Sequence, residues 1–221
     1  MKNKNNKKRR AGKVFMTVGI VLLLASLGLT VYNLWDENRA QKVTATALKI
    51  IEETRSENLG NKNGTSENGQ NNNPGEKPAY QIAPQMAVPE KEIDGHYYIG
   101  TIDIPSLGLS LPVQSEWSLP NLRTSPCRYK GSPYLDDMII AAHNYSCHFG
   151  NIRDLVEGDE VIFTDMDGNV FVYNVAYTET IDGYDIPRMS EGEWDLTLFT
   201  CTLSSVSRVT VRCVRQAGSD A

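Results

Sequence analysis

A cysteine and an arginine near the C-terminus have the spacing of two facing residues in a β-hairpin. Residues 197–212 alternate apolar and polar side chains around Ser204 and Ser205, which is typical of two strands joined by a tight turn. A turn centred on the two serines places Cys201 opposite Arg208, with Cβ atoms about 4.5–5.5 Å apart. At that separation a guanidinium stabilises a thiolate or an oxyanion that forms beside it. A shift of one residue in the register would separate the pair.

The same alternation assigns the faces of both strands. On the first strand, one face is expected to carry Leu196, Leu198 and Thr200, and the other Thr197, Phe199 and Cys201. On the second, Val209 and Val211 are expected to point away from Arg208, Thr210 and Arg212. The candidate thiol and guanidinium therefore belong to the more polar face.

A histidine is the further group that such a thiol needs. An ordinary cysteine, with a pKa of about 8.5, is only a few per cent ionised at pH 7, so a nucleophilic one requires a base or a cationic neighbour. His143 follows the apolar run Met138–Ala142, at the end of a predicted strand, where scaffolds hold reactive groups. Two alternatives stay open from these residues: His143 as a hydrogen-bonded loop residue, and Cys201 as a buried or disulfide-bonded one.

The remaining cysteines and histidines allow other arrangements. Full pairing of the four cysteines has three connectivities, and a catalytic Cys201 excludes all three. The sequence leaves open whether one disulfide bond or none forms among Cys127, Cys147 and Cys213. A zinc site from His143, Cys147, His148 and Cys201 is disfavoured, because no Cys-x-x-Cys pair is present and adjacent ligands are strained. The segment 165–169 lacks the downstream glutamate of a calcium loop and is interpreted as a turn. We therefore expect no metal and no cofactor.

The N-terminus predicts a membrane anchor. Seven of the 22 basic residues precede Val14 without an acidic one, and residues 14–35 form an apolar run long enough to cross a bilayer. A signal peptide is the alternative, but its apolar region is shorter and no small-x-small cleavage site follows Leu34. The positive-inside rule places residues 1–13 in the cytoplasm and the rest outside. That remainder has 15 basic and 27 acidic residues, a formal charge of −12, which argues against nucleic acid as a partner.

The rest of the chain divides into a stalk, a linker and one folded domain. Residues 36–55 are expected to form a stalk helix, since Ala40, Val43, Ala47 and Ile50 recur at helical spacing. Residues 56–80 are rich in Asn, Gly, Lys and Glu and are expected to be flexible. Residues 81–221 are expected to fold as a closed β-barrel of about eight strands. The predicted strands are Tyr98–Ile104, Leu109–Val113, Met138–Ala142, Glu160–Thr164, Val170–Ile181, Leu196–Thr200 and Arg208–Arg215; the predicted short helices are Trp117–Leu122 and Phe149–Val156.

These motifs resemble those of the sortases, the membrane-anchored cysteine transpeptidases of Gram-positive bacteria. Residues 197–201 match the family signature Thr-Leu-x-Thr-Cys, Arg208 opens the next strand, and His143 lies upstream. The resemblance covers roughly residues 98–215 and implies a sortase barrel. It also implies that Cys201 is the nucleophile, His143 the general acid and base, and Arg208 the group that holds the substrate and the oxyanion.

The resemblance further implies the substrate class and the location of the enzyme. Sortases cleave a C-terminal sorting signal of the Leu-Pro-x-Thr-Gly type in secreted proteins and transfer the thioacyl intermediate to an amine of a peptidoglycan precursor or a pilin lysine. Thr200 and Tyr184 are the expected substrate contacts, with Tyr184 in the loop 182–194 that is expected to line the groove. The catalytic domain is expected outside a single-pass membrane anchor. Two alternatives remain: a thiol peptidase that releases its product to water, and an inactive tethered barrel that only binds.

Overall fold

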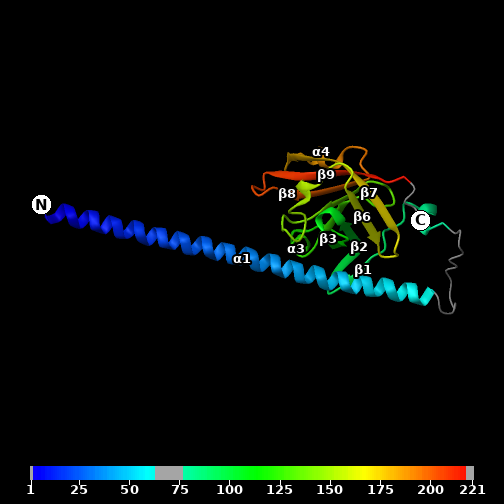
Figure 1. The fold of residues 1–221 in the computed structure, drawn as a ribbon, viewed down its shortest axis with the longest axis horizontal. Coiled ribbons are helices and arrows are strands. Elements are labelled where there is room, and N and C mark those ends of the chain that lie inside the picture. The colour runs from blue at the N-terminus through cyan, green and yellow to red at the C-terminus, as the bar shows by residue number, and fades with distance from the viewer. Residues whose placement is uncertain (1, 63–76, 218–221) are drawn as a thin grey trace. The chain divides into compact units, whose positions relative to one another are not determined.

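The computed structural model describes residues 2–62 and 77–217, and the chain divides into two compact units, Met1–Arg39 and Ala40–Ala221 (Figure 1). The helices and helical turns are α1 (Lys2–Lys62), α2 (Ala79–Ile82), η1 (Pro105–Leu107), α3 (Leu119–Leu122), η2 (Ile152–Asp154) and α4 (Ile186–Ser190). The strands are β1 (Lys91–Ile93), β2 (His96–Ile104), β3 (Leu109–Gln114), β4 (Cys127–Lys130), β5 (Met138–Ala141), β6 (Glu160–Asp165), β7 (Val170–Asp182), β8 (Leu196–Cys201) and β9 (Ser207–Arg215).

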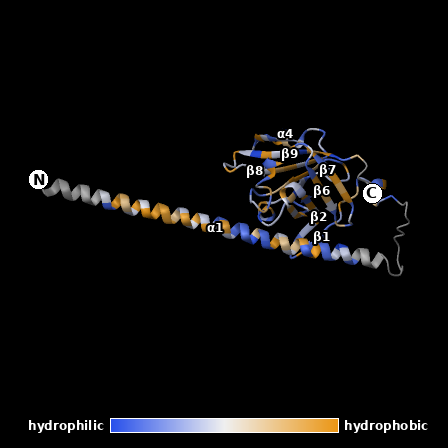
Figure 2. Ribbon diagram, viewed as in Figure 1, coloured by the Kyte–Doolittle hydropathy of each residue, from blue (hydrophilic) through white to orange (hydrophobic). Residues whose placement is uncertain are grey.

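The N-terminal part of α1 is strongly apolar. Among the described residues, Gly12–Glu57 is the one helical stretch long and apolar enough to cross a membrane. Figure 2 shows the hydrophobic colour concentrated in the part of α1 nearer the N-terminus and a mixed, more polar surface further along. The leucines from Leu22 to Leu24 are each more than 60% exposed, so no protein core covers them.

Helix α1 runs past the point where the flexible linker is predicted to begin. It includes the predicted stalk and continues to Lys62. Near this end the guanidinium of Arg55 donates to the carbonyl oxygens of Thr164 (2.6 Å) and Asp165 (2.9 Å). Tertiary contacts of this kind extend helices through segments of weak intrinsic propensity. Residues 63–76, most of the predicted linker, lie outside the described residues.

The strands close into a barrel, as the sequence predicts. Within the described residues one sheet has the order β1-β2-β3-β4-β5-β8-β9-β7-β6, and an additional pairing of β2 with β6 closes the ring of eight strands. β1 lies outside this ring and forms a hairpin with β2. Its two turn residues, Asp94 and Gly95, both have positive φ, which matches the primed turns preferred in tight hairpins.

The main core fills the barrel with the side chains that alternation assigns to the inner face. Leu196 and Leu198 of β8 pack with Val209 and Val211 of β9 in one buried cluster. Cys213 continues the same row and is fully buried. The face assignments made from the sequence are therefore confirmed for this hairpin.

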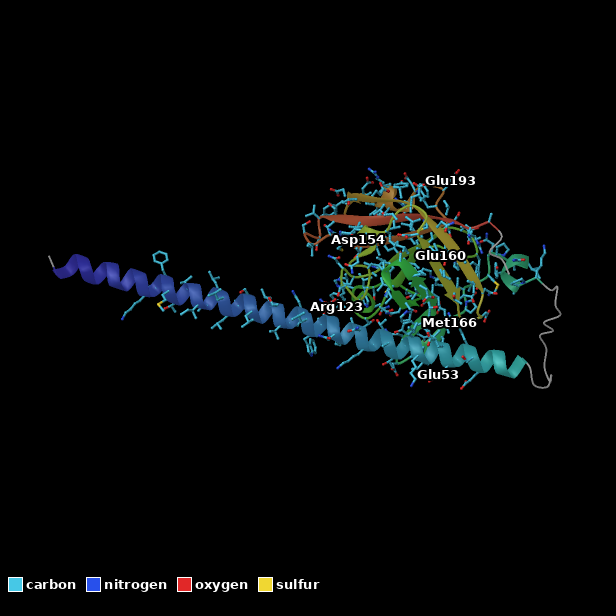
Figure 3. All side chains as sticks on the ribbon, in the orientation of Figure 1. Glu53, Arg123, Asp154, Glu160, Met166 and Glu193 are labelled. Atoms are coloured by element: carbon cyan, nitrogen blue, oxygen red, sulfur yellow. The ribbon has the colours of Figure 1, made fainter. Side chains whose placement is uncertain are left out.

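A second, smaller core joins the C-terminal part of α1 to the barrel. Ala47 and Ile51 of the helix are buried against Ile93, Tyr98 and Met166. Figure 3 shows Met166 on the side of the barrel next to α1, near the helical turn that carries Glu53. The folded unit therefore begins at Ala40 in this structure, well before residue 81, where the sequence places its start.

The contact stripe on the helix differs slightly from the predicted one. Ala40, Thr44, Ala47 and Ile51 are buried, whereas Val43 and Ile50, predicted to share that stripe, are only half-buried. Because Thr44 is polar, a pattern of apolar residues does not reveal that it belongs to the buried face of the helix.

The shorter elements account for the other differences from the sequence-based expectations. The three residues of β1 and the four of β4 are too few to show a period in the sequence. Of the two predicted helices, residues 149–156 contain only the turn η2, and residues 117–122 only the four residues of α3. Pro120 at the start of α3 and the hydroxyl of Ser118, which accepts from the amide of Asn121, explain why a helix starts there.

Candidate active site

The hairpin register predicted from the two serines is the register observed. β8 and β9 pair antiparallel with Cys201 opposite Arg208. The amide of Thr202 donates to the carbonyl oxygen of Ser207 at 2.9 Å. The adjacent pair, Cys201 and Arg208, is therefore of the non-hydrogen-bonded type, in which facing side chains approach most closely. The thiol and the guanidinium start from neighbouring Cβ atoms on the outer face of the barrel.

The turn that sets this register uses more residues than a two-serine turn. Thr202 and Ser207, bonded through their backbones just past the end of β8, close the loop 203–206, and the amide of Ser205 donates to the carbonyl oxygen of Thr202 at 2.9 Å. Ser205 has a φ of +59°, which a small polar residue tolerates better than a bulky one. A four-residue loop thus keeps the pairing without requiring Ser-Ser to form a primed turn.

His143 leaves the barrel beside the cysteine. β5 and β8 run parallel with Ala141 opposite Phe199, and the amide of Ala142 continues the ladder to the carbonyl oxygen of Phe199 at 3.1 Å. His143 comes directly after this last ladder bond, as Cys201 comes two residues after Phe199. Because parallel strands end at the same edge of a sheet, the histidine loop begins where the cysteine strand ends.

Cys201 and Arg208 therefore face each other on β8 and β9, and His143 follows the end of β5, the strand that pairs with β8 on its other side. All three side chains are half-buried, as reactive groups that are both held and accessible must be. The arrangement suits covalent catalysis by a thiol with a neighbouring imidazole and a neighbouring cation.

The loop after β5 holds the imidazole by stacking. The rings of His143 and Tyr145 are nearly parallel, with centroids 4.5 Å apart and an angle of 15° between planes. The loop then folds back, since the amide of Phe149 donates to the carbonyl oxygen of His143 at 3.2 Å. A Cβ at Gly150 would lie 2.6 Å from the carbonyl oxygen of Tyr145, so this return requires glycine.

The guanidinium of Arg208 is oriented by its own hairpin. Nη1 donates to the carbonyl oxygens of Ser205 (3.1 Å) and Ser207 (3.2 Å). Both bonds come from one nitrogen, and a guanidinium has five N–H donors in total, so Nε and Nη2 retain donors for another acceptor. The β7–β8 loop approaches this nitrogen at Gly183, where a Cβ would lie 3.0 Å from Nη1 and 2.6 Å from the carbonyl oxygen of Val206.

A buried arginine fastens the β7–β8 loop to the outer face. Arg212 is 2% exposed, and its Nη1 donates to the carbonyl oxygen of Met189 (3.0 Å) and to Thr197 Oγ1 (3.1 Å). Nη2 donates to the carbonyl oxygen of Arg188 (2.5 Å), and Nε to Glu179 Oε1 (3.1 Å). Helix α4, which carries Met189, is thereby held over β8 and β9 beside the candidate site.

An aromatic cluster lies on the same outer face, on the side of the site toward β4. Phe199, two residues before Cys201 and on the same face of β8, contacts the ring of Tyr129 edge-on at 5.5 Å. Tyr129 in turn contacts Trp117 edge-on at 5.9 Å. Trp117 is 43% exposed, so this cluster offers an accessible apolar surface next to the thiol.

The two expected substrate contacts have different positions. Tyr184, in the β7–β8 loop, is 90% exposed and available to a ligand. Thr200 is buried on the core side of β8, and its hydroxyl donates to the carbonyl oxygen of Ala142 at 2.9 Å. The structure therefore gives Thr200 a structural role, because it ties the cysteine strand to the histidine strand.

The four cysteines are all present as thiols. Burial raises the pKa of Cys127 and of Cys213 to about 12, because the core does not solvate a thiolate. Cys147 and Cys201 are half-buried. Of the two accessible thiols, only Cys201 faces an arginine across a strand pair.

The other arrangements considered from the sequence find no support. Within residues 2–62 and 77–217, no group of three or more His, Cys, Asp or Glu side chains is placed to hold a metal ion. The 165–169 segment forms the β6–β7 turn, in which Asp165 Oδ1 accepts from the amides of Asp167 and Asn169, each at 2.9 Å. The Asp165 carboxylate is thus occupied by its own turn.

Sequence patterns did not reveal Arg212 or Tyr145 as parts of this region. Alternation does place Arg212 on the face of Arg208, but an arginine on that face is ordinarily a solvated strand residue. One sequence feature could have indicated the role of Arg212: Arg208, Thr210 and Arg212 form a continuous polar row on one face of β9. Tyr145 gave no signal, because stacking depends on the path of the loop.

Comparisons with known proteins agree with this fold. A family model described as the sortase domain matches residues 102–218, which is more than half of the chain. Sortase A from Corynebacterium diphtheriae is similar in structure, with 22% identity and a TM-score of 0.50, over 55% of this chain and 61% of that chain. Sortase C1 from Streptococcus agalactiae has 26% identity and a TM-score of 0.50, over 57% of this chain and 72% of that chain. No curated protein matches.

The chain belongs to the sortase family, a class of cysteine transpeptidases with an eight-stranded barrel. It spans less than two thirds of the length of the diphtheria sortase A chain.

Proposed function

We propose that this chain is a membrane-anchored transpeptidase that cleaves a sorting signal of the Leu-Pro-x-Thr-Gly type and passes the acyl group to an amine. The observation that supports the proposal is that Cys201 of β8 faces Arg208 of β9, while His143 follows the end of β5, the other neighbour of β8. This juxtaposition brings a nucleophile, a proton carrier and an oxyanion donor together on the outer face of the barrel.

The proposed reaction has two acyl transfers. Cys201 gives its proton to His143, its Sγ attacks the carbonyl carbon of the substrate threonine, and Arg208 donates to the oxyanion that forms. The C–N bond then breaks, His143 gives a proton to the leaving amine, and a thioester remains on Cys201. An incoming amine then attacks the thioester and gives a proton to His143. The C–S bond breaks as the new amide forms, and His143 returns the proton to Cys201 Sγ.

Two surfaces beside the thiol suit an extended peptide. The β7–β8 loop, held by Arg212, lies over β9 on one side, and the aromatic cluster of Trp117, Tyr129 and Phe199 lies on the other. We assign the substrate to the outer face between these two surfaces. Tyr184, the most exposed side chain of the loop, is the proposed peptide contact within it.

The N-terminal helix supports a location at the cell membrane. The proposed span is residues 14–35, with the basic residues 1–13 in the cytoplasm and the barrel outside. On that side of the membrane the enzyme meets secreted proteins as substrates. The amine acceptors proposed are a peptidoglycan precursor or a pilin lysine, since both present a primary amine to the thioester.

The test uses the full-length protein in lipid nanodiscs with a fluorogenic sorting-signal peptide and a glycine-based amine. We expect cleavage and an amide product whose mass includes the added amine. Cys201→Ala is expected to abolish both, whereas Cys147→Ala, at the other accessible thiol, is expected to leave both in place. Equal turnover by the wild type and Cys201→Ala would contradict the proposal. Cleavage that yields only the free acid in the presence of amine would identify a thiol hydrolase instead.

A further inference from the structure

A threonine on α1 contacts the loop that carries the candidate catalytic histidine. Thr44 is 6% exposed, and its Oγ1 donates to the carbonyl oxygen of Thr124 at 3.0 Å. The same oxygen lies 3.3 Å from Nε2 of His148, which is fully buried. The single hydroxyl hydrogen of Thr44 is directed at Thr124, which leaves Oγ1 available as an acceptor for His148 Nε2.

A row of aromatic rings continues from this contact to His143. The ring of His148 lies 5.5 Å from that of Tyr145, and the ring of Tyr145 stacks on His143 at 4.5 Å. The backbone closes the same segment, because the amides of His148 (3.0 Å) and Gly150 (2.8 Å) both donate to the carbonyl oxygen of Tyr145. The position of the His143 ring is therefore linked to that of the buried His148 ring.

The helix is fixed firmly enough to serve as the support for this row. Ala47 and Ile51 follow Thr44 on the same helical stripe and are buried in the second core. One turn further, Arg55 donates to Thr101 Oγ1 at 3.1 Å and to two backbone carbonyls of the barrel. Thr44 thus projects from a helix that the barrel holds on both sides of Ile51.

We propose that Thr44 is a positioning residue for His143, and that it acts through His148 and Tyr145 to hold the imidazole beside Cys201. The inference rests on the proposed function, since it assigns His143 a role in proton transfer. It makes the docked part of α1 a component of the active enzyme in addition to its part in anchoring. A small displacement of a catalytic group lowers the rate of the chemical step far more than it lowers peptide affinity.

The test compares three threonine variants in the full-length protein in nanodiscs. Thr44→Val keeps the shape and removes the hydroxyl, and we expect about a 10-fold lower kcat with KM for the sorting peptide nearly unchanged. Thr44→Ser restores the hydroxyl and is expected to restore kcat. Thr46→Val, on the exposed side of the same helix, removes a hydroxyl that bonds only within the helix and is expected to match the wild type.

A second variant tests the row of rings if Thr44→Val does not fold. Tyr145→Leu removes the ring that stacks on His143 and is expected to lower kcat by a similar factor, with KM nearly unchanged. Wild-type kcat in Thr44→Val and in Tyr145→Leu would overturn the inference while leaving the transpeptidase intact. An inactive wild type would instead contradict the proposed function.

Discussion

At the scale of single residues, the four thiols differ in burial and in their neighbours. Cys127 and Cys213 lie in the core, where burial raises the pKa of each to about 12. Thiolates are the reactive species, so at pH 8 these two cysteines remain protonated and enclosed. Cys201 is accessible and faces a guanidinium on the neighbouring strand. Reactivity toward a thiol reagent should therefore separate Cys201 from the core cysteines.

We predict that the Cys147→Ala variant reacts with one equivalent of a methanethiosulfonate reagent at pH 8 in its native state. The site of modification, found by peptide mass mapping, is expected to be Cys201. Labelling of Cys127 and Cys213 is expected only after unfolding in guanidinium chloride. Modification of Cys201 only in the unfolded sample would mean that the thiol is enclosed, and would favour a barrel that binds without reacting.

At the scale of elements, the β7–β8 loop depends on one buried cation. Glu179 accepts from two arginines, Arg212 at 3.1 Å and Arg188 at 2.7 Å. Arg188 is largely exposed, and a surface pair of this kind adds little to stability. Arg212 is buried and also donates to the backbone of the loop. Substitution of the buried Arg212 can therefore be compared with substitution of the exposed Arg188 as a control, because both arginines bind the same carboxylate.

We predict that Arg212→Leu lowers the free energy of unfolding by about 3 kcal/mol, because it removes the buried cation beside Glu179 and leaves two loop carbonyls without their donor. The released loop should also raise KM for the sorting peptide more than it lowers kcat. Arg188→Leu is expected to change neither quantity measurably. Denaturant unfolding and steady-state kinetics provide the measurements, and equal stability of the two variants would refute the assigned role of Arg212.

The sequence predicted well those strands that show a sustained alternation or a continuous apolar run. The seven predicted strands correspond to β2, β3, β5, β6, β7, β8 and β9, and the hairpin pairing followed from alternation and a central turn. The proximity of Cys201 and Arg208 is local in sequence and was therefore predictable. The position of His143 beside them needs the parallel pairing of β5 with β8, which connects residues far apart in the chain. Only the family resemblance supplied that contact in advance.

The support around the site was not predictable for a physical reason. Thr44, Tyr145 and Arg212 act through tertiary contacts whose partners are remote in sequence or lie in irregular loops. A polar residue within an apolar helical stripe also looks like a break in the pattern. Thr200 was predicted as a substrate contact from its place in the signature, and nothing in the sequence indicated that its hydroxyl joins two strands.

At the scale of the whole molecule, the folded unit includes part of the long helix. Residues 40–57 cover Ile93, Tyr98 and Met166, which would otherwise be exposed apolar side chains. An exposed cluster of this kind is uncommon on a stable monomer. The folded unit therefore includes this part of α1 as well as the barrel.

We predict that a chain beginning at residue 78 melts about 5 °C or more below one that begins at residue 40, because it loses the second core. The shorter chain should also bind more of a hydrophobic dye at ambient temperature. Thermal unfolding followed by circular dichroism makes the comparison. Identical melting temperatures would show that the helix contributes nothing to the fold.

The most direct test of the central claim is the intact mass of the full-length protein after reaction with a sorting-signal peptide in the absence of an amine. We predict an added mass equal to the acyl fragment, located on Cys201, removed by a subsequent pulse of amine, and absent from both Cys201→Ala and His143→Ala. An acyl adduct that forms equally well on Cys201→Ala, or a wild type that cleaves the peptide without Cys201 ever carrying the acyl group, would contradict the account.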